Sequence, residues 1–513
     1  MRKAESSVAE SLRDAHVALR SAWYDAALEL LEGCEDWPQD DAERGVVLKA
    51  ETIGRRDPVG ALGYLARIAD IPASEAGRYR YALQLGKAHA AVRDLSRAES
   101  WFEQARALCA VVPDGTSTVA FHDLRMRWFR RNYEPDAPEF ALAIAHPDPT
   151  IVSSAYAIRA WLHAGRGAYR EQVADLMRAV SFVTSPSGEQ LDVAAAACST
   201  HALAQLAFET ANDEAIALAR TALDSIAWTS DVRAAHYMTV RALGWDAFMR
   251  GRAAQAQWMF KDARALAPTP AWSVMAHLDR AYVARLSRNE GWAIEELAEA
   301  HRLARGIRWE SCFDEQRQVL VVLAVLYAPV DAALAQYYAA TYTRLGTENL
   351  DPQLALATDR RALAHAHYAQ GRVDQTLGRD EAARAALRDA YAIFDSAEFH
   401  YRAALAATAL AEMTGEACWR ERALAHAARY PDCPLAAAVD DAVAREEAMP
   451  PELTPLQRQI ARALWSGVEI AELSHRFSRG RLTIERHVAA VYAAFGVTSR
   501  GALLREVRAR GIA

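Results

Sequence analysis

The chain has 513 residues, of which 52% are hydrophobic and 24% are charged, and its formal net charge is −7. This balance excludes a disordered chain and predicts a folded protein with an ample core. The length allows several domains or one long array of repeats. The six cysteines form no Cys-x-x-Cys pair, so they indicate separate thiols in a reducing compartment.

The amino terminus argues against secretion. Residues 1–16 are polar and charged and lack the apolar segment of a secretory signal. Further along, the longest apolar run, from Val319 to Ala328, is too short to span a bilayer. We therefore expect a cytoplasmic protein without a membrane partner.

Residues 1–430 are rich in Ala and Leu at helical spacing, with breaks at Gly, Pro and Asp, which suggests internal repeats. The clearest unit consists of Val240, Leu243-Gly244, Ala247, Ala256, Phe260, Ala263 and Pro268. A second copy consists of Leu85-Gly86, His89, Ala98, Phe102 and Ala105. Weaker copies keep the tail of the pattern, at Ala27, Leu31 and Cys34; Ala61, Leu65 and Ile68; Ala215, Ala219 and Ala222; Ala293, Leu297 and Ala300; and Ala383, Leu387 and Ala390.

This pattern resembles the tetratricopeptide repeat. Its small residues let two antiparallel helices approach closely, and the aromatic residue fills the gap between one hairpin and the next. Each hairpin leaves an apolar face that only its neighbour can cover, so a solenoid is expected, with an irregular all-helical bundle as the alternative. A solenoid surface usually binds a partner, here a peptide, a protein or a small molecule. The tryptophans that either line this surface or pack in the core are Trp101, Trp128, Trp161, Trp245, Trp258, Trp272, Trp292 and Trp309.

Two segments are candidate joints. Residues 132–150 contain four prolines and interrupt the helical spacing, which indicates a loop or joint within the array. Residues 431–452 contain four more, and Leu435 to Ala448 between them are expected to form a short acidic connecting helix. This second segment is the predicted linker to the last part of the chain.

Residues 453–513 carry short helical patterns separated by tight breaks. Thr454 before Pro455 is typical of an N-cap followed by Pro at the first helical position. The breaks after the first three helices are predicted at Gly467, Gly480 and Gly496. Ser499 then caps a fourth helix. Two short helices joined tightly and followed by a third predict a helix-turn-helix.

The same segment resembles the LuxR/GerE-type helix-turn-helix of bacterial transcription regulators. The matches need no gap and are Leu453-Thr454-Pro455, Gly467, Thr483-Ile484-Glu485-Arg486-His487-Val488 and Gly496-Val497-Thr498-Ser499-Arg500. Several spaced matches are far more specific than one short motif, although they cover only about an eighth of the chain. The departures from the family pattern are Leu456 to Gln459, Glu469 to Ser474, Arg479-Gly480 and Glu485. A Glu in the groove repels phosphate, yet it can accept a hydrogen bond from cytosine.

The resemblance implies that the third helix enters the major groove of double-stranded DNA. The residues it places on DNA are Arg479, Arg481, Thr483, Glu485, Arg486, Ala489, Ser499 and Arg500. Arg486 is expected near the groove and Arg481 nearer the backbone. The resemblance also implies a homodimer on DNA, joined through the apolar stripe of Leu503, Leu504 and Val507. The alternative is that all three side chains are internal and the domain binds as a monomer.

Charge supports this interpretation. Residues 452–513 contain ten Arg, no Lys or Asp and five Glu, which gives +5, so residues 1–451 carry −12. A basic module on an acidic body is typical of a DNA-binding protein. The structural alternative is a degenerate helix-turn-helix that serves only packing or dimerisation.

No enzyme motif or nucleotide switch is found in the sequence. The chain lacks a P-loop, His-Glu-x-x-His and Gly-x-Ser-x-Gly. His365 and His367 are two residues apart and do not share a helix face, so they do not suggest a metal pair. We expect neither catalytic residues nor a cofactor or metal.

Together these observations predict an all-α protein. A tetratricopeptide-like solenoid occupies residues 1–430, a linker 431–452, and a four-helix LuxR-type domain 453–513. The expected function is transcription regulation in a bacterium, with a signal bound in the array controlling the DNA-binding domain. The alternative is a protein-interaction scaffold whose helix-turn-helix no longer binds DNA.

Overall fold

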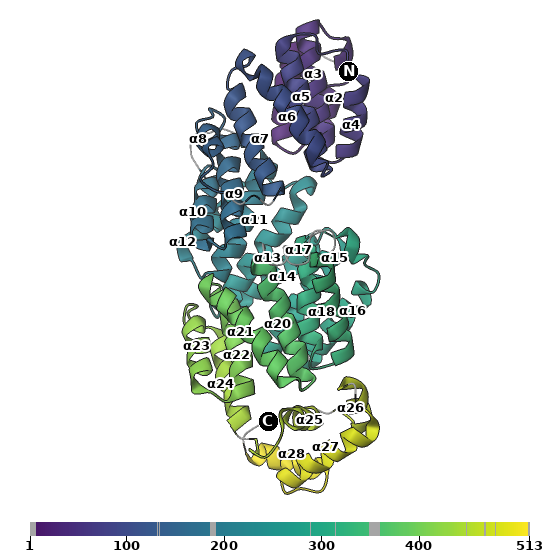
Figure 1. Cartoon of the computed structure of the whole chain (residues 1–513), viewed down its shortest axis with the longest axis vertical. Helices are drawn as coiled ribbons and strands as arrows, with labels where there is room; N and C mark the ends of the chain where they lie inside the picture. Colours follow the sequence, from purple (N-terminus) through teal and green to yellow (C-terminus); the bar gives the residue numbers. More distant parts are fainter. Residues whose placement is uncertain are drawn as a thin grey trace. The chain divides into compact units, whose positions relative to one another are not determined.

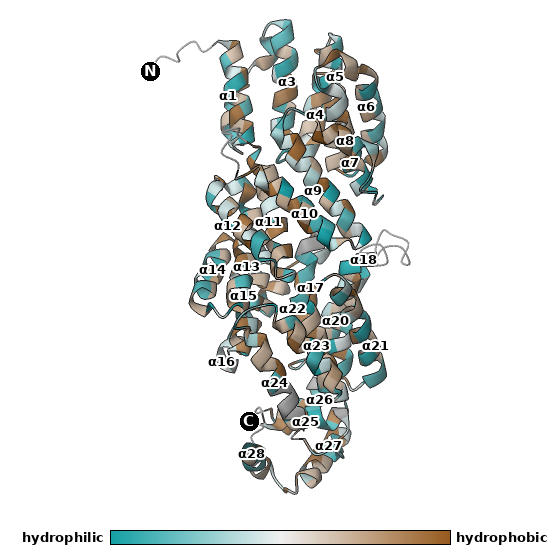
Figure 2. Ribbon diagram, turned by 90° about the vertical axis from the view of Figure 1, so that its left-hand side faces the viewer, coloured by the Kyte–Doolittle hydropathy of each residue, from teal (hydrophilic) through white to brown (hydrophobic). Residues whose placement is uncertain are grey.

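In the computed structural model, the chain is all-α and has no strand in the part described (Figure 1). The structure describes residues 7–510, except 131, 133, 185–190, 288, 313, 348–359, 448, 466–467 and 478. The predicted fold class is confirmed. Apolar and polar residues are interspersed along the helices (Figure 2), so each helix has apolar side chains to bury against a neighbour. Within the described residues, no helix combines the length and the apolarity needed to cross a membrane.

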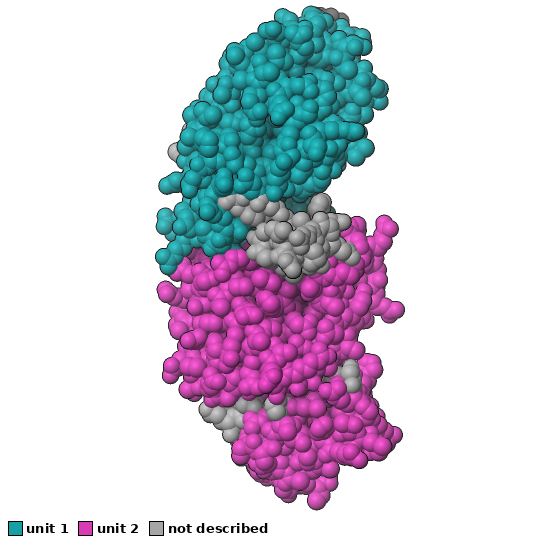
Figure 3. Space-filling view, viewed as in Figure 1, with its two compact units in different colours: residues 1–207, 213–239 teal, residues 208–212, 240–513 magenta. Residues whose placement is uncertain are grey.

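Contacts divide the chain into two compact units (Figure 3). Unit 1 comprises residues 1–207 and 213–239, and unit 2 comprises residues 208–212 and 240–513. Unit 2 therefore holds part of the helical array and the C-terminal helices together.

Unit 1 consists of helical hairpins in chain order. Its main helices are α1 (Val8–Arg20), α2 (Tyr24–Leu30), α3 (Gln39–Gly54), α4 (Pro58–Arg67), α5 (Glu75–Ala91), α6 (Leu95–Leu108), α7 (Gly115–Phe129), α8 (Pro138–Ile144), α9 (Pro149–Arg166), α10 (Tyr169–Ser181), α11 (Val193–Glu209), α12 (Asp213–Ser225) and the start of α13 (Arg233–Met249). Helix α3 packs on α5, α5 on α7, and α7 on α9, so one helix of each hairpin contacts the same helix of the next.

Unit 2 continues in the same way. Its array helices are α14 (Ala253–Leu266), α15 (Pro270–Leu286), α16 (Glu290–Ala304), α17 (Asp314–Tyr327), α18 (Ala332–Thr347), α20 (Arg360–Thr376), α21 (Asp380–Ser396), α22 (His400–Thr414), α23 (Ala417–Ala427) and α24 (Pro434–Glu447). The connecting helix predicted at Leu435 to Ala448 is α24. Its Leu435 and Val439 are buried, and the helix packs against α22 and α23.

The repeat pattern explains how the hairpins close. A Cβ atom at Gly86 would lie 2.5 Å from Cε1 of Phe102, so the ring of α6 occupies the space that Gly86 of α5 leaves empty. Gly244 and Phe260 repeat this contact, with a Cβ placed 3.2 Å from the ring. The ring of Phe102 also stacks on His122 of α7, with ring centroids 5.2 Å apart. The aromatic residue thus packs within its own hairpin as well as against the next.

Every residue of the weaker predicted copies is buried. None of Ala27, Leu31, Cys34, Ala61, Leu65, Ile68, Ala215, Ala219, Ala222, Ala293, Leu297, Ala300, Ala383, Leu387 and Ala390 is more than 4% exposed. The drifted copies therefore serve the same packing role as the two clear ones.

The loop or joint predicted at residues 132–150 is only partly correct, because a short helix, 138–144, interrupts it and α9 begins at its end. Pro138 and Pro149 are the first residues of α8 and α9, where a proline lacks no hydrogen bond because the first N–H groups of a helix have no partner. The prolines mark helix starts here, so the segment holds a short helix and continues the array.

Candidate functional site

The C-terminal residues form a small domain of four helices. They are α25 (Pro455–Trp465), α26 (Ile470–Arg476), α27 (Arg481–Ala494) and α28 (Arg500–Ala509). Thr454 caps α25 reciprocally, since Thr454 N donates to Gln457 Oε1 at 2.8 Å and Gln457 N donates to Thr454 Oγ1 at 3.3 Å. The helix end predicted at Gly496 is confirmed by its φ of +66°. Gly467, predicted to end the first helix, lies outside the described residues.

One core holds the four helices together. Its fully or nearly fully buried members include Ile460, Leu464, Leu473, Phe477, Ile484, Val488, Val491, Leu503 and Val507. Helix α25 packs against α26, α27 and α28. The domain therefore fixes the orientation of α27 and leaves the other face of that helix to solvent.

The exposed face of α27 carries most of the residues predicted to contact DNA. Arg479, Arg481, Thr483, Arg486 and Ala489 are exposed, and Glu485 is half-buried. Arg481 Nε donates to Glu485 Oε1 at 2.8 Å along the helix. That ion pair holds Glu485 beside a positive charge and reduces its repulsion of phosphate.

Leu482 lies on the same face and was missed by the sequence analysis. The residue is 74% exposed, the largest value among the exposed large hydrophobic residues described. It shares a helix face with Arg486 and Ala489, four and seven residues further on. The sequence could have indicated this exposure, because Leu482 does not share the helical spacing of the buried residues Ile484, Val488 and Val491.

The two predicted contacts near α28 have structural roles. Ser499 caps α28 by accepting a hydrogen bond from Ala502 N at 3.3 Å. Arg500 Nε donates to the carbonyl of Leu464 at 3.0 Å, and its Nη1 lies 2.6 Å from Glu469 Oε1. Arg500 thus joins α28 to the end of α25.

The predicted dimer stripe is mostly internal. Leu503 and Val507 are fully buried in the domain core, whereas Leu504 is half-buried. Only Leu504 of the three retains surface that a second copy can contact.

Within unit 2, the small domain contacts the array through α25 and α26. Gln459 donates a side-chain hydrogen bond to the carbonyl of Gln375, at the end of α20. Leu456 lies against Gly378, where a Cβ would be 3.3 Å from the leucine Cβ. His475 Nδ1 lies 4.0 Å from Asp331 Oδ2. These contacts leave the outer face of α27 uncovered.

A second candidate site is a cavity of about 640 Å³ inside unit 1. Its lining comes mainly from α1, α3, α5, α7, α9 and α11. A volume in this range suits a drug-sized ligand. The chain positions of the lining span residues 16–199, so no local sequence motif announces the cavity.

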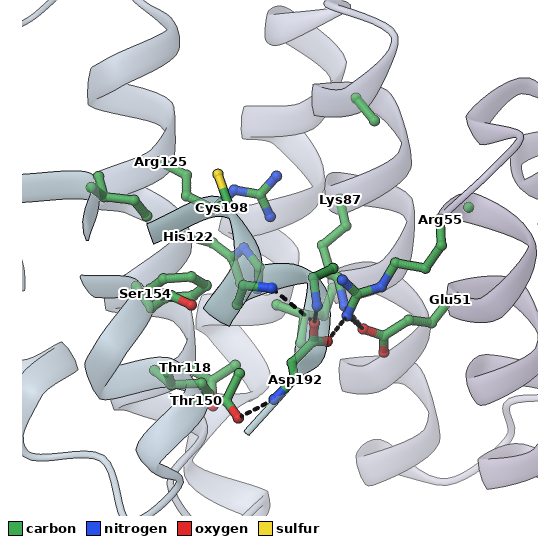
Figure 4. Close-up of a pocket in the computed structure, with 18 of the residues that line it drawn as sticks. Glu51, Arg55, Lys87, Thr118, His122, Arg125, Thr150, Ser154, Asp192 and Cys198 are labelled. Carbon is green, nitrogen blue, oxygen red and sulfur yellow. Dashed lines mark hydrogen bonds and ion pairs between the residues drawn. The ribbon is translucent and has the colours of Figure 1, made fainter. Parts of the chain in front are cut away.

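One group of lining residues is ionic. Lys87 Nζ lies 2.6 Å from Glu51 Oε1, and Arg55 Nη2 lies 2.5 Å from Asp192 Oδ2 and 3.6 Å from Glu51 Oε1 (Figure 4). Burial opposes ionisation of Glu51, but Lys87 and Arg55 outweigh it and lower the pKa of this carboxyl to about 2. Arg20 pairs with Asp148 in the same lining. These acids are thus matched by cations.

The other group is aromatic. Phe121, Trp128 and Phe129 of α7 and Trp161 of α9 line the cavity, and the rings of Trp128 and Trp161 meet edge to face with centroids 5.1 Å apart. Of the tryptophans considered from the sequence, these two line the cavity. Trp245, Trp272 and Trp309 are buried in the core.

Arg125 lies in this aromatic group, and among the described residues it makes no hydrogen bond or ion pair. Its guanidinium carbon lies 5.7 Å from the ring centre of Phe129, and no dashed line reaches it in Figure 4. Burial and the charge of Arg55 lower the pKa of Arg125 to about 10, so it is still positive at neutral pH. A cation without an anion in a cavity is costly unless a ligand supplies one.

Two more polar atoms in the lining have no partner in the part of the chain described. They are Nδ1 of His122, which is 5% exposed, and Nε1 of Trp161. Burial and the charges of Arg125 and Lys87 lower the pKa of His122 well below its usual value, so this ring is neutral at neutral pH. Unpaired buried polar atoms are uncommon and point to a missing partner.

Metal binding receives no support from the described residues, where no three His, Cys, Asp or Glu side chains gather. The cysteines form no disulfide in the described structure, and Cys198 lines the cavity.

No protein-family model matches the chain, and no curated protein sequence matches it. Among solved structures, it is similar to the apo form of the quorum sensor NprR from B. thuringiensis. The TM-score is 0.40 and the identity 11%, over 75% of this chain and 98% of that one. A likeness this distant does not bear on what the chain does.

Proposed function

We propose that the chain is a DNA-binding transcription regulator with a LuxR-type helix-turn-helix and a helical array that binds a signal. The observation that carries this is the outer face of α27, where Arg481, Leu482 and Arg486 stand exposed on a helix fixed from behind by a closed core. Arginines at the start of a recognition helix suit guanine and phosphate, and an apolar side chain suits the methyl group of thymine. No catalytic step is part of the proposal.

The second part of the proposal, signal binding, concerns the helical array. Its cavity of about 640 Å³ holds unpaired polar atoms beside aromatic rings, which is what a ligand site needs. We propose that a ligand bound in the array alters DNA binding by the C-terminal domain, which acts as a dimer joined near Leu504.

A scaffold that has lost DNA binding is the competing function. The specific observation in its favour is that Arg481 is paired with Glu485 and Arg500 is used internally, which removes free positive charge from the surface. The two functions predict different effects of salt on DNA binding. Contacts with DNA phosphates release counterions, so the affinity of a regulator for DNA falls as salt rises, whereas a scaffold makes no such contacts.

The test is binding of the full chain to a pool of random duplexes at several salt concentrations, followed by fluorescence anisotropy. We expect affinity to fall steeply as salt rises, and the double variant R481A/R486A to bind much more weakly. The matched control is R505A/R508A, which removes two exposed charges from α28 of the same domain. Salt-independent or undetectable binding by the wild type would favour the scaffold.

A further inference from the structure

We infer that the cavity of unit 1 is a binding site for an apolar carboxylic acid, with the carboxylate at Arg125 and the apolar body among the aromatic rings. The inference rests on the proposed sensing role of the array and names the chemical class of its ligand. It is built on the residues that line the cavity.

The net charge of the side chains that line the cavity favours a ligand with one negative charge. The lining contains four cations, Arg20, Arg55, Lys87 and Arg125, and three carboxylates, Glu51, Asp148 and Asp192. The first three cations have carboxylate partners, which leaves the charge of Arg125 in excess. His16 and His122 have lowered pKa values and do not add to this charge at neutral pH. One negative charge on a ligand therefore balances the cavity, and a dianion would overcharge it.

Arg125 is the place for that charge because its guanidinium is planar and presents donors in a fork that matches a carboxylate. The charge of Arg55 acts on it unfavourably, as its lowered pKa indicates, so an added anion relieves a repulsion already present. Neutral His122 and the indole of Trp161 each offer a polar atom without a partner in the described structure.

The aromatic side chains of the lining favour an apolar body for the rest of the ligand. Phe121, Arg125 and Phe129 follow one another at four-residue spacing and share a face of α7. Trp128 and Trp161 complete this aromatic wall. The side chains of Phe121 and Phe129 offer no hydrogen bond, and Trp128 and Trp161 offer only their indole N–H groups, so along this wall the amide groups of a longer peptide would lose bonds to water with little replacement. A compact apolar body loses nothing there and gains burial.

The experiment uses the full chain, without DNA, and two matched pairs of probes. The first pair is 1-naphthaleneacetic acid and its uncharged amide, and the second is N-acetyl-Leu-Phe and its carboxamide. Binding is measured by calorimetry at neutral pH and physiological ionic strength. For the wild type we expect the naphthalene acid to bind about tenfold or more tightly than its amide, as a charge-assisted hydrogen bond implies.

Three variants locate the effect. R125M should bring the naphthalene acid and amide to within about twofold of each other, because only the charge-assisted bond is lost. R78M removes an exposed arginine of α5 outside the lining and should leave the preference unchanged. S154F fills part of the cavity and should weaken both naphthalene probes. Helicity and the unfolding midpoint of each variant show whether it is folded.

Equal binding of the naphthalene acid and amide by the wild type would overturn the inference, as would a preference that survives in folded R125M. A preference seen only in the peptide pair would also overturn it, in favour of a peptide carboxyl terminus. DNA is absent throughout, so a failure of DNA binding does not affect this outcome. Conversely, a negative outcome leaves the DNA-binding proposal standing.

Discussion

Single side chains carry the two recognition events proposed for this protein. Arg486 stands exposed on α27 without the intrahelical ion pair that occupies Arg481. Among the residues that the structure describes, Arg125 of the cavity lining has no carboxylate partner, whereas Arg55 and Lys87 have theirs. Both proposals therefore rest on a guanidinium that has no ion-pair partner in the described structure.

The first prediction concerns Arg486. Replacing it with alanine should weaken binding to a selected operator by about 1–3 kcal/mol, the range expected for a bidentate contact with guanine. The measurement is fluorescence anisotropy on the operator and on single-base variants of it. R508A, an exposed arginine on α28, serves as the control. Unchanged affinity in R486A would contradict the role assigned to this residue.

The second prediction concerns the glycine beneath the repeat aromatic. Gly86→Ala should lower the free energy of unfolding by about 1–3 kcal/mol, because the new Cβ would lie 2.5 Å from the buried ring of Phe102. Gly63→Ala in α4 is the matched control, since its Cβ would meet nothing within 4 Å and should stabilise the helix by up to about 1 kcal/mol. Urea unfolding measures both. Similar effects of the two substitutions would contradict the close packing.

The third prediction concerns pH and the pair His400 and His426, whose Nδ1 atoms lie 3.0 Å apart. Burial and the charge of His426 lower the pKa of His400 to about 4. The unfolded chain, with a pKa near 6.5, takes up this proton first, so stability falls as the pH drops from about 6.5 to 4, by about 3 kcal/mol from this group.

Urea unfolding over that pH range tests the third prediction. His400→Gln keeps a polar side chain that does not titrate, and it should flatten the dependence of stability on pH. A variant as sensitive to pH as the wild type would show that other groups cause the loss.

At the scale of elements, the sequence predicted what depends on local spacing. The drifted copies such as Ala383, Leu387 and Ala390 proved to be buried, because burial of a helix face requires small and apolar residues at fixed intervals. The repeat copy in α10 was missed because Gln172 stands where the pattern expects Ala before Leu176 and Ala179, although all three are buried. Pro138 and Pro149 were misjudged because a proline favours both a loop and a helix start.

The site was less predictable for a different reason. The face of α27 follows from one helix and its spacing, so the exposed arginines could be named in advance. The cavity gathers side chains from helices spread over residues 16–199, and only stacking brings them together. The contact of Arg500 with the carbonyl of Leu464 could not be predicted, because its partner is a backbone atom that no sequence pattern reveals.

The fourth prediction concerns α28 and the dimer. Leu504→Asp should leave the domain folded and reduce the mass on a two-half-site duplex to that of a monomer, because Leu504 is only half-buried. Leu503→Asp should unfold the domain instead, since Leu503 is fully buried in the core. Light scattering gives the mass and circular dichroism the helicity. A folded Leu504→Asp variant that remains dimeric would exclude this helix as the interface.

At the scale of the whole molecule, the question is how the array reaches the DNA-binding domain. The sequence suggested control through residues 431–452. The structure adds direct contacts in unit 2, where Leu456 lies on Gly378 and Gln459 bonds to the carbonyl of Gln375. The end of α20 therefore supports α25, the helix against which the other three helices of the small domain pack.

The fifth prediction tests this support. The double variant L456A/Q459A should release the small domain, because both of its contacts with the end of α20 are lost. In a chain of 56.4 kDa, a docked domain gives broad amide signals in NMR, whereas a released one tumbles by itself and gives sharp signals. R486A, which alters only the exposed face of α27, should keep the broad signals. Broad signals in the double variant would show that other contacts hold the domain.

The cavity lining has a thermodynamic consequence for the array. In a stack of hairpins each repeat is coupled only to its neighbours, so unfolding can start at any weak interface and spread. A ligand seated between α7 and α9 adds contacts between the two hairpins to which these helices belong. Ligand binding should therefore make these hairpins unfold together as one cooperative unit. A bound signal molecule would thus limit how many repeats unfold when one of them opens locally.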